Sequence, residues 1–172
     1  MEYRVNIPFE TGTIEKYRAG DILYLTGTMY TARDAAHKRM FESGEIPFDA
    51  EGAVVYYLGP TPARPGQIIG SAGPTTSGRM DKYTPMLLER GMKGMIGKGR
   101  RSEEVRAAIA ANHAIYMGAT GGAGALLSKC IKSAEVVAYE DLGTEAVRRL
   151  YVEDFPVTVL IDSLGTEFRP DK

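Results

Sequence analysis

Short apolar runs alternate with stretches of helical periodicity along the chain. The runs have strand length, whereas the longer stretches repeat their apolar positions every three or four residues. We predict strands at residues 3–8, 21–26, 53–58, 67–71, 93–96, 114–117, 135–139 and 157–161.

Capping residues support the helical stretches. Thr31 can cap a helix whose Asp34 lies three residues on, and Gly44 is a plausible stop. Thr84 precedes a proline suited to the first helical position, and Ser102 precedes two glutamates in a favourable first turn. We predict helices at residues 31–42, 85–90 and 102–111, and another that opens at 118–124 and runs to about 132.

This alternation indicates a mixed α/β layered fold. A doubly wound parallel sheet is one possibility, but the spacing is irregular and several helical stretches are short. The other is a strand-rich sandwich with helices packed on one side. The chain has 172 residues, 44% of them hydrophobic and 25% charged, which suits one globular domain over residues 1–172 with a polar tail from about residue 165.

Charge and cysteine content narrow the functional classes. The formal net charge of −1 gives no general electrostatic case for binding nucleic acid or an anionic membrane. No apolar run approaches the roughly 20 residues of a membrane span, and the first residues do not resemble a secretion signal. Cys130 is the only cysteine, so it forms no internal disulfide, cannot hold a metal cluster alone and indicates a reducing cytoplasm.

Three polar stretches rich in glycine each follow a predicted strand: TGTMYTARDAAHKR (26–39), SAGPTTSGRMD (71–81) and MIGKGRR (95–101). They contain Arg33, Arg79 and Lys98, together with the hydroxyl groups of residues 75–77. Two guanidinium groups and an ammonium group, if they converge, form a site for a small dianion. Solvated charges beside ordinary turns are the alternative reading of the same residues.

Other motifs add little. Gly99 stands where a P-loop needs serine or threonine, and GATGGAG (118–124) lacks the dinucleotide-binding spacing, so it either cradles an anion at a helix start or packs a helix on the sheet. His37 and His113 are expected to be structural or exposed, and Cys130 a small buried side chain. The chain lacks a GxSxG elbow, paired metal-ligand histidines and a CxxC motif, which argues against hydrolase, zinc and redox chemistry.

The same stretches, with GMIGKG (94–99) and GATGGAGALL (118–127), resemble the β subunit, or C-terminal domain, of class I fumarate hydratases, a family that includes the L-tartrate dehydratase β subunit. The resemblance covers residues 21–164. It implies a swivelling β/β/α domain and a reversible hydro-lyase acting on a C4 dicarboxylate. It also implies a four-iron, four-sulfur cluster held by three cysteines of a partner α subunit, because Cys130 alone cannot supply these ligands.

Carried onto this sequence, the resemblance gives catalytic roles to Thr75 and Lys98 and substrate-binding roles to Arg33, Arg79 and Thr76. The threonine would transfer a proton, and the cations would bind the substrate carboxylates. A free threonine hydroxyl is a very weak acid and base, so it needs a cationic neighbour such as Lys98 or a relay through the partner.

Fumarate is the favoured substrate and tartrate the alternative. Two rival functions remain open, a phosphocarrier swivelling domain and a non-catalytic structural subunit. The first needs a phosphorylatable histidine in the glycine/threonine loop, and TTSGR has none.

Overall fold

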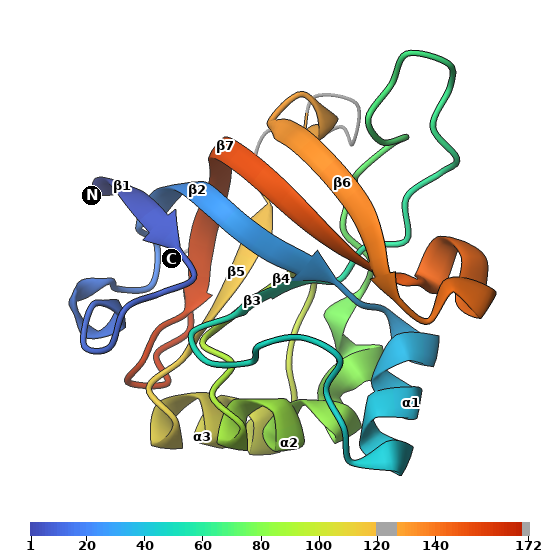
Figure 1. Cartoon of the computed structure of the whole chain (residues 1–172). Coiled ribbons are helices and arrows are strands. Elements are labelled where there is room, and N and C mark those ends of the chain that lie inside the picture. Colours follow the sequence, from blue (N-terminus) through green and yellow to red (C-terminus); the bar gives the residue numbers. More distant parts are fainter. Residues whose placement is uncertain (120–126, 170–172) are drawn as a thin grey trace.

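The computed structural model describes residues 1–119 and 127–169. Within these ranges, strands and three α-helices alternate, with short 3₁₀ helices between them (Figure 1). The strands are β1 (Glu2–Ile7), β2 (Ile22–Thr31), β3 (Val54–Tyr56), β4 (Gly94–Gly97), β5 (Ile115–Ala119), β6 (Ile131–Ala138) and β7 (Val147–Ile161). The helices are α1 (Asp34–Ser43), α2 (Thr84–Glu89) and α3 (Glu103–Ala111), and the 3₁₀ helices are η1 (Ile14–Lys16), η2 (Ser77–Tyr83) and η3 (Glu140–Glu145).

The strands form one sheet in the order β1-β2-β3-β4-β5-β7-β6. The first five pair in parallel, and β7 runs antiparallel to β5 and β6. A further antiparallel pairing, from Ile22↔Thr158 to Tyr30↔Arg149, joins β2 to β7 and closes β2, β3, β4, β5 and β7 into a ring. The strand-rich α/β class predicted from the sequence is confirmed, but one sheet closed on itself replaces the two sheets of a sandwich.

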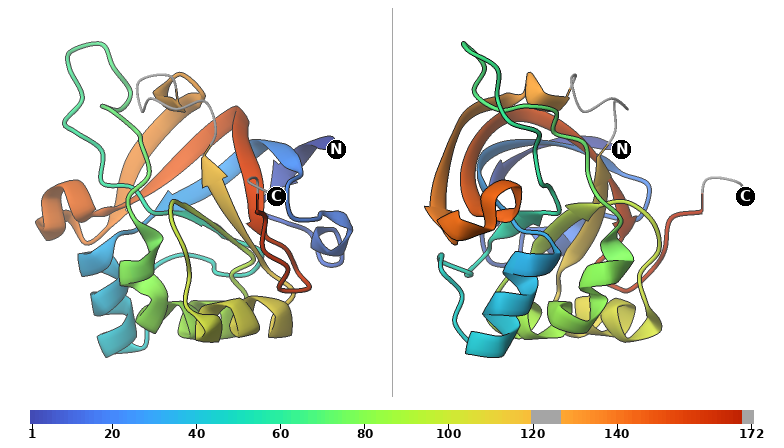
Figure 2. Two further views of the ribbon diagram at one scale, coloured as in Figure 1. Left: turned by 180° about the vertical axis from the view of Figure 1, so that it is seen from behind. Right: turned by 90° about the vertical axis from the view of Figure 1, so that its right-hand side faces the viewer.

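The three α-helices gather at one end of the closed sheet (Figures 1 and 2). Two apolar clusters result. One fills the interior of the sheet around residues such as Leu23, Leu25 and Phe155, and the other lies between the sheet and the helices, around Met40 and Leu87. The prediction that helices pack on one side of the strands is therefore confirmed.

Several predicted boundaries are wrong, and the hydrogen bonds of two threonines show why neither caps a helix. Strand β2 continues to Thr31, because the Thr31 hydroxyl accepts a hydrogen bond from the Arg148 N–H (3.1 Å) on β7 and does not cap a helix. Helix α1 begins only at Asp34. Thr84 lies inside the first turn of α2 and donates its hydroxyl to the Met80 carbonyl (2.8 Å).

Of the other predicted elements, two helix ends are confirmed, and one strand and one helix end are wrong. The stop at Gly44, with φ of 71°, and the Ser102 cap, which accepts a hydrogen bond from the Val105 N–H, are confirmed. Residues 68–70 form bends, and residues 67 and 71 have no regular secondary structure, so the strand predicted there is wrong. The helix predicted to run to about residue 132 cannot do so because β6 begins at Ile131, and residues 120–124 of GATGGAG lie outside the described residues.

Two further expectations concern the chain end and the membrane. Part of the expected polar tail folds back on β7, where Glu167 bridges to Ile161 and the Phe168 N–H donates to the Leu160 carbonyl (2.8 Å). Among the residues described, no helix is both long and apolar enough to cross a bilayer.

Candidate active site

The candidate site lies where neighbouring parallel strands end. Arg33 follows β2, Gly59 follows β3 and Lys98 follows β4, and these strands pair in the order β2-β3-β4. Because parallel strands present their carboxyl ends at the same edge of a sheet, the three segments are brought together there. The loop of residues 71–81 joins them, since the Thr75 N–H donates to the Tyr57 carbonyl at 2.8 Å.

Arg79 links two of the segments through its guanidinium group. Its Nη2 donates to the Thr75 Oγ1 at 2.9 Å, and its Nε lies 3.1 Å from the Asp34 Oδ2. The Arg79 side chain is 51% exposed, and its Nη1 has no hydrogen-bond partner within the described part of the chain. The guanidinium therefore holds the Thr75 hydroxyl, and as far as the described residues go, its Nη1 is left for a ligand.

Arg33 occupies the N-cap position of α1, and its side chain lies against the backbone of Gly59. A Cβ at residue 59 would come within 2.8 Å of the Arg33 Cδ and Nη1, so glycine lets this side chain lie here without a shift. The Arg33 Nε and the Asp34 Oδ1 are buried without a partner among the residues the structure describes. This unmet hydrogen-bonding capacity adjoins Arg79.

Lys98 and Thr76 meet through their backbones. They form an isolated parallel bridge, and the Ser77 N–H donates to the Lys98 carbonyl at 2.9 Å. Both side chains are exposed. No hydrogen bond or ion pair between described residues engages the ammonium group of the exposed Lys98 side chain.

The structure thus connects all five site residues predicted from the sequence, to different degrees. Thr75 and Arg79 touch through side chains, Thr76 and Lys98 pair through backbones, and Arg33 joins them through its neighbour Asp34. No side-chain hydrogen bond in the described ranges joins Lys98 to Thr75. The cation that contacts the threonine is Arg79, and not Lys98 as the sequence analysis suggested.

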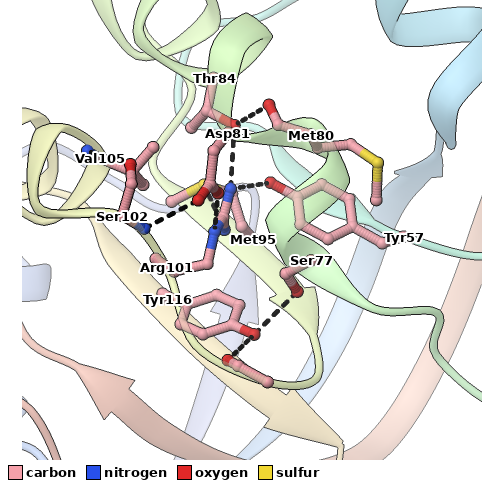
Figure 3. A network of polar contacts seen from close by, with 11 residues as sticks. Tyr57, Ser77, Met80, Asp81, Thr84, Met95, Arg101, Ser102, Val105 and Tyr116 are labelled. Carbon is pink, nitrogen blue, oxygen red and sulfur yellow. Dashed lines mark hydrogen bonds and ion pairs between the residues drawn. The ribbon is translucent and has the colours of Figure 1, made fainter.

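Arg101 forms a buried polar network beneath these loops (Figure 3). Its side chain is 0% exposed, and its Nε donates to the Asp81 Oδ1 at 2.6 Å. Its Nη2 donates to the Tyr57 hydroxyl (3.1 Å) and to the Thr84 Oγ1 (2.9 Å). Burial lowers the pKa of Arg101, but Tyr57 and Asp81 outweigh this effect and leave its pKa raised, so the buried group stays charged.

Tyr116 extends the network from β5. Its hydroxyl donates to the Gly99 carbonyl (2.8 Å) and lies 2.7 Å from the Ser77 Oγ, from which it accepts a hydrogen bond. Burial raises the pKa of Tyr116 to about 12, so the hydroxyl keeps its proton near neutral pH. A neutral tyrosine therefore ties the loop of residues 71–81 to the turn that carries Lys98.

His37 lies between the site and the network. Its ring is fully buried, its Nδ1–H donates to the Arg33 carbonyl (2.8 Å), and it packs edge-on against Tyr57. Burial lowers the pKa of His37 to about 4, against smaller raising effects from the Arg33 carbonyl and Asp34. His37 is thus a neutral, buried side chain, the environment expected of a structural histidine, and His113 is exposed (64%) as expected.

Metal ligands are scarce. Cys130 is half-buried, and burial raises the pKa of its thiol, which disfavours the thiolate that a metal needs. No group of three or more histidine, cysteine, aspartate or glutamate side chains with metal-binding geometry occurs within residues 1–119 and 127–169.

Three further candidates, Asp34, Asp81 and Arg101, were not predicted from the sequence. Asp34 was interpreted only as a capping residue, and Arg101 follows another arginine in what looks like a solvated turn. The sequence contained one sign of a role for Asp81. It ends the motif SAGPTTSGRMD, whose other polar residues were already candidates for the site.

Comparison with known proteins identifies relatives over nearly the whole chain. Residues 2–171 match the family model described as "Fumarase C-terminus". The anaerobic class I fumarate hydratase of Escherichia coli (strain K12) is 40% identical over 161 residues, which cover 90% of this chain and 29% of that protein. Fumarate hydratase 2 of Leishmania major is 38% identical, over 90% of this chain and 28% of that protein.

One relative has a similar length. A proposed L(+)-tartrate dehydratase subunit beta of Methanocaldococcus jannaschii is 34% identical over 175 residues, which cover 96% of this chain and 89% of that protein. The chain therefore spans less than a third of the fumarate hydratases that it matches but most of this separate subunit.

Proposed function

The chain belongs to the fumarase C-terminus family, and on this premise we propose that it is the β subunit of a class I hydro-lyase that hydrates fumarate reversibly to malate. The observation that carries the proposal is the contact of Arg79 with the Thr75 hydroxyl, beside two further cations at the carboxyl ends of neighbouring strands. A C4 dicarboxylate needs such charges, because two carboxylates must be bound and oriented.

The cations have a second task during the reaction. Removal of a proton next to a carboxylate builds up negative charge, which fixed positive groups stabilise. Arg33, Arg79 and Lys98 are assigned to the substrate carboxylates, with Lys98 also contributing to catalysis and Thr76 at the rim. The free Nη1 of Arg79 and the unpaired ammonium of Lys98 support this assignment within the residues described.

Thr75 is assigned to proton transfer. The Arg79 Nη2–H points its positive charge at the Thr75 oxygen, so negative charge that develops on this oxygen is stabilised. The charged neighbour that a threonine requires for such a step is therefore already in contact with it.

The family resemblance implies an iron–sulfur cluster, and the donor set of this chain does not fit one. The chain has a single cysteine, and its thiol has a raised pKa, whereas such clusters are held by several thiolates. We therefore assign the cluster to a partner α subunit and derive no step through it. The similarity to a separate β subunit supports a hetero-oligomer, in which this chain is one swivelling β/β/α domain over residues 1–172.

Reconstitution with a cluster-bearing α subunit tests the proposal. Water addition to fumarate and water loss from L-tartrate are measured on the same complex at matched substrate concentrations. Fumarate is expected to be preferred. If tartrate is clearly preferred, it replaces fumarate as the proposed substrate. If a complex that carries its cluster acts on neither compound, the hydro-lyase assignment is overturned.

A further inference from the structure

We propose that Arg101 and Asp81 act as a positioning pair, which fixes the loop carrying Thr75 and Arg79 against the turn carrying Lys98. This inference rests on the proposed function, since it concerns the same site. The Arg101 side chain is 0% exposed and that of Asp81 is 16% exposed, and both act through the loops they hold together.

The pair joins two separate loops through one carboxylate. The Asp81 Oδ1 accepts from the Arg101 Nε at 2.6 Å, and its Oδ2 accepts from the Ser102 N–H at 2.7 Å. Asp81 lies in η2, two residues after Arg79, and Arg101 lies three residues after Lys98. A shift of either loop would therefore break hydrogen bonds to a fully buried charge.

The planar guanidinium group of Arg101 contacts several elements of the structure at once. Besides Asp81, it reaches the Tyr57 hydroxyl next to β3 and Thr84 at the start of α2 (Figure 3). Its plane lies near the rings of Tyr57 and Tyr116, with the Cζ 5.2 and 4.8 Å from their centroids. These contacts fix the group in direction as well as in place.

Close packing between the loops adds to the constraint. A Cβ on Gly97 would lie 1.9 Å from the Ser77 Oγ and 2.7 Å from the Tyr57 Cδ2, so only glycine allows this approach. The Ser77 N–H donates to the Lys98 carbonyl, and Tyr116 bonds both Ser77 and Gly99. The two loops therefore behave as one unit at the point where Thr75 and Lys98 face the site.

Stability alone does not account for an ion pair in this place. Desolvation of two charges offsets much of their attraction, and well-packed apolar side chains commonly stabilise a core as well or better. What an apolar replacement cannot supply is directional bonding to several elements at once. Since a displacement of about 1 Å of a catalytic group can cost 100-fold in rate, precise placement is the function we assign to the pair.

The test compares Arg101→Met with Leu23→Ala in the reconstituted complex. Leu23 is fully buried at the start of β2, and the site lies beyond the other end of that strand. We expect Arg101→Met to lower kcat by roughly 10- to 100-fold, more than it raises KM. Leu23→Ala should leave kcat within about two-fold of wild type, even if it lowers the Tm as much as Arg101→Met does. An Arg101→Met complex with kcat within two-fold of wild type overturns the proposal.

Asp81→Asn provides a second variant where Arg101→Met does not fold. It preserves the shape of the side chain but loses the charge and one acceptor, and we expect a smaller loss of kcat in the same direction. Unchanged kcat in Asp81→Asn also counts against the positioning role.

A readout without catalysis separates this proposal from the proposed function. Trypsin cleavage after Arg79 and Lys98 is timed in the native full-length chain, and Arg101→Met should accelerate it relative to Leu23→Ala. If the wild-type complex has no hydro-lyase activity, the proposed function fails, while faster cleavage still supports the loop-holding role. Equal cleavage rates in the two variants overturn that role.

Discussion

Arg79, in η2, and Arg101, which bonds Asp81 of the same element, carry the same guanidinium group in sharply different surroundings. The Arg79 side chain is 51% exposed and bonds Thr75 and Asp34, whereas Arg101 is 0% exposed and bonds Asp81, Tyr57 and Thr84. Among the residues described, the exposed group keeps its Nη1 donors without a partner. The buried group directs nearly all of its donors at the protein.

This contrast separates recognition from support. A ligand can compete only for donors that the protein leaves free, so Arg79 is suited to bind a carboxylate. Donors that are satisfied in the interior instead restrict where their partners lie. The site therefore has an outer layer of available charges over an inner layer of committed ones, and each prediction below probes one side of this division.

The largest effect is expected for the outer charges. Arg79→Ala and Lys98→Ala, each in the reconstituted complex, should lower kcat/KM by about 100-fold or more, because each removes a positioned charge from the transition state. Steady-state kinetics with fumarate measures the loss. Unchanged turnover in both variants would instead favour a purely structural subunit.

A smaller effect is expected at His37, which contacts both layers. Because burial holds its folded-state pKa near 4, below the ordinary 6.5, the unfolded chain takes up a proton in this pH window that the folded chain does not. Stability should therefore fall as the pH drops from 6.5 towards 4. Between pH 7 and pH 5, His37 alone should reduce the free energy of unfolding by about 2 kcal/mol.

Urea unfolding of the wild type and of His37→Asn at both pH values measures this contribution. Asparagine can still donate to the Arg33 carbonyl but does not titrate in this range, and the exposed His113 is common to both proteins. The wild type should lose more stability than the variant between the two pH values. An equal loss would show that His37 is not held neutral by its burial.

How far the sequence could predict the fold is clearest at β7. Only residues 157–161 were recognised, although the strand begins at Val147. The buried residues Val147 and Leu150 are three positions apart, and so are Val152 and Phe155, where Asp154 adopts a positive φ of 47° that breaks the alternation. A local pattern cannot reveal a strand whose irregularity depends on its partners β2 and β6.

The site divides along the same line. Arg33, Thr75, Thr76, Arg79 and Lys98 could be proposed because their segments carry family motifs, and those of Arg33 and Lys98 also follow strands. Arg101 could not, since Arg100 beside it is exposed and the two look alike in the sequence. Only the approach of Asp81, 20 positions away, distinguishes the buried arginine from the solvated one.

The smallest effect concerns Asp34, which connects the outer layer to α1. Asp34→Ala removes the acceptor of the Arg79 Nε, so the guanidinium keeps its charge but is no longer held in one orientation. We therefore expect kcat/KM to fall by about 10-fold. Asp141→Ala is the matched control, because Asp141 also accepts from an arginine, Arg39, on an exposed surface but makes no contact with the site. Its activity should equal that of wild type, since an exposed ion pair contributes little. A gain in activity for Asp34→Ala would contradict this expectation. It would mean that Asp34 competes with the substrate for the Arg79 guanidinium and does not orient that group.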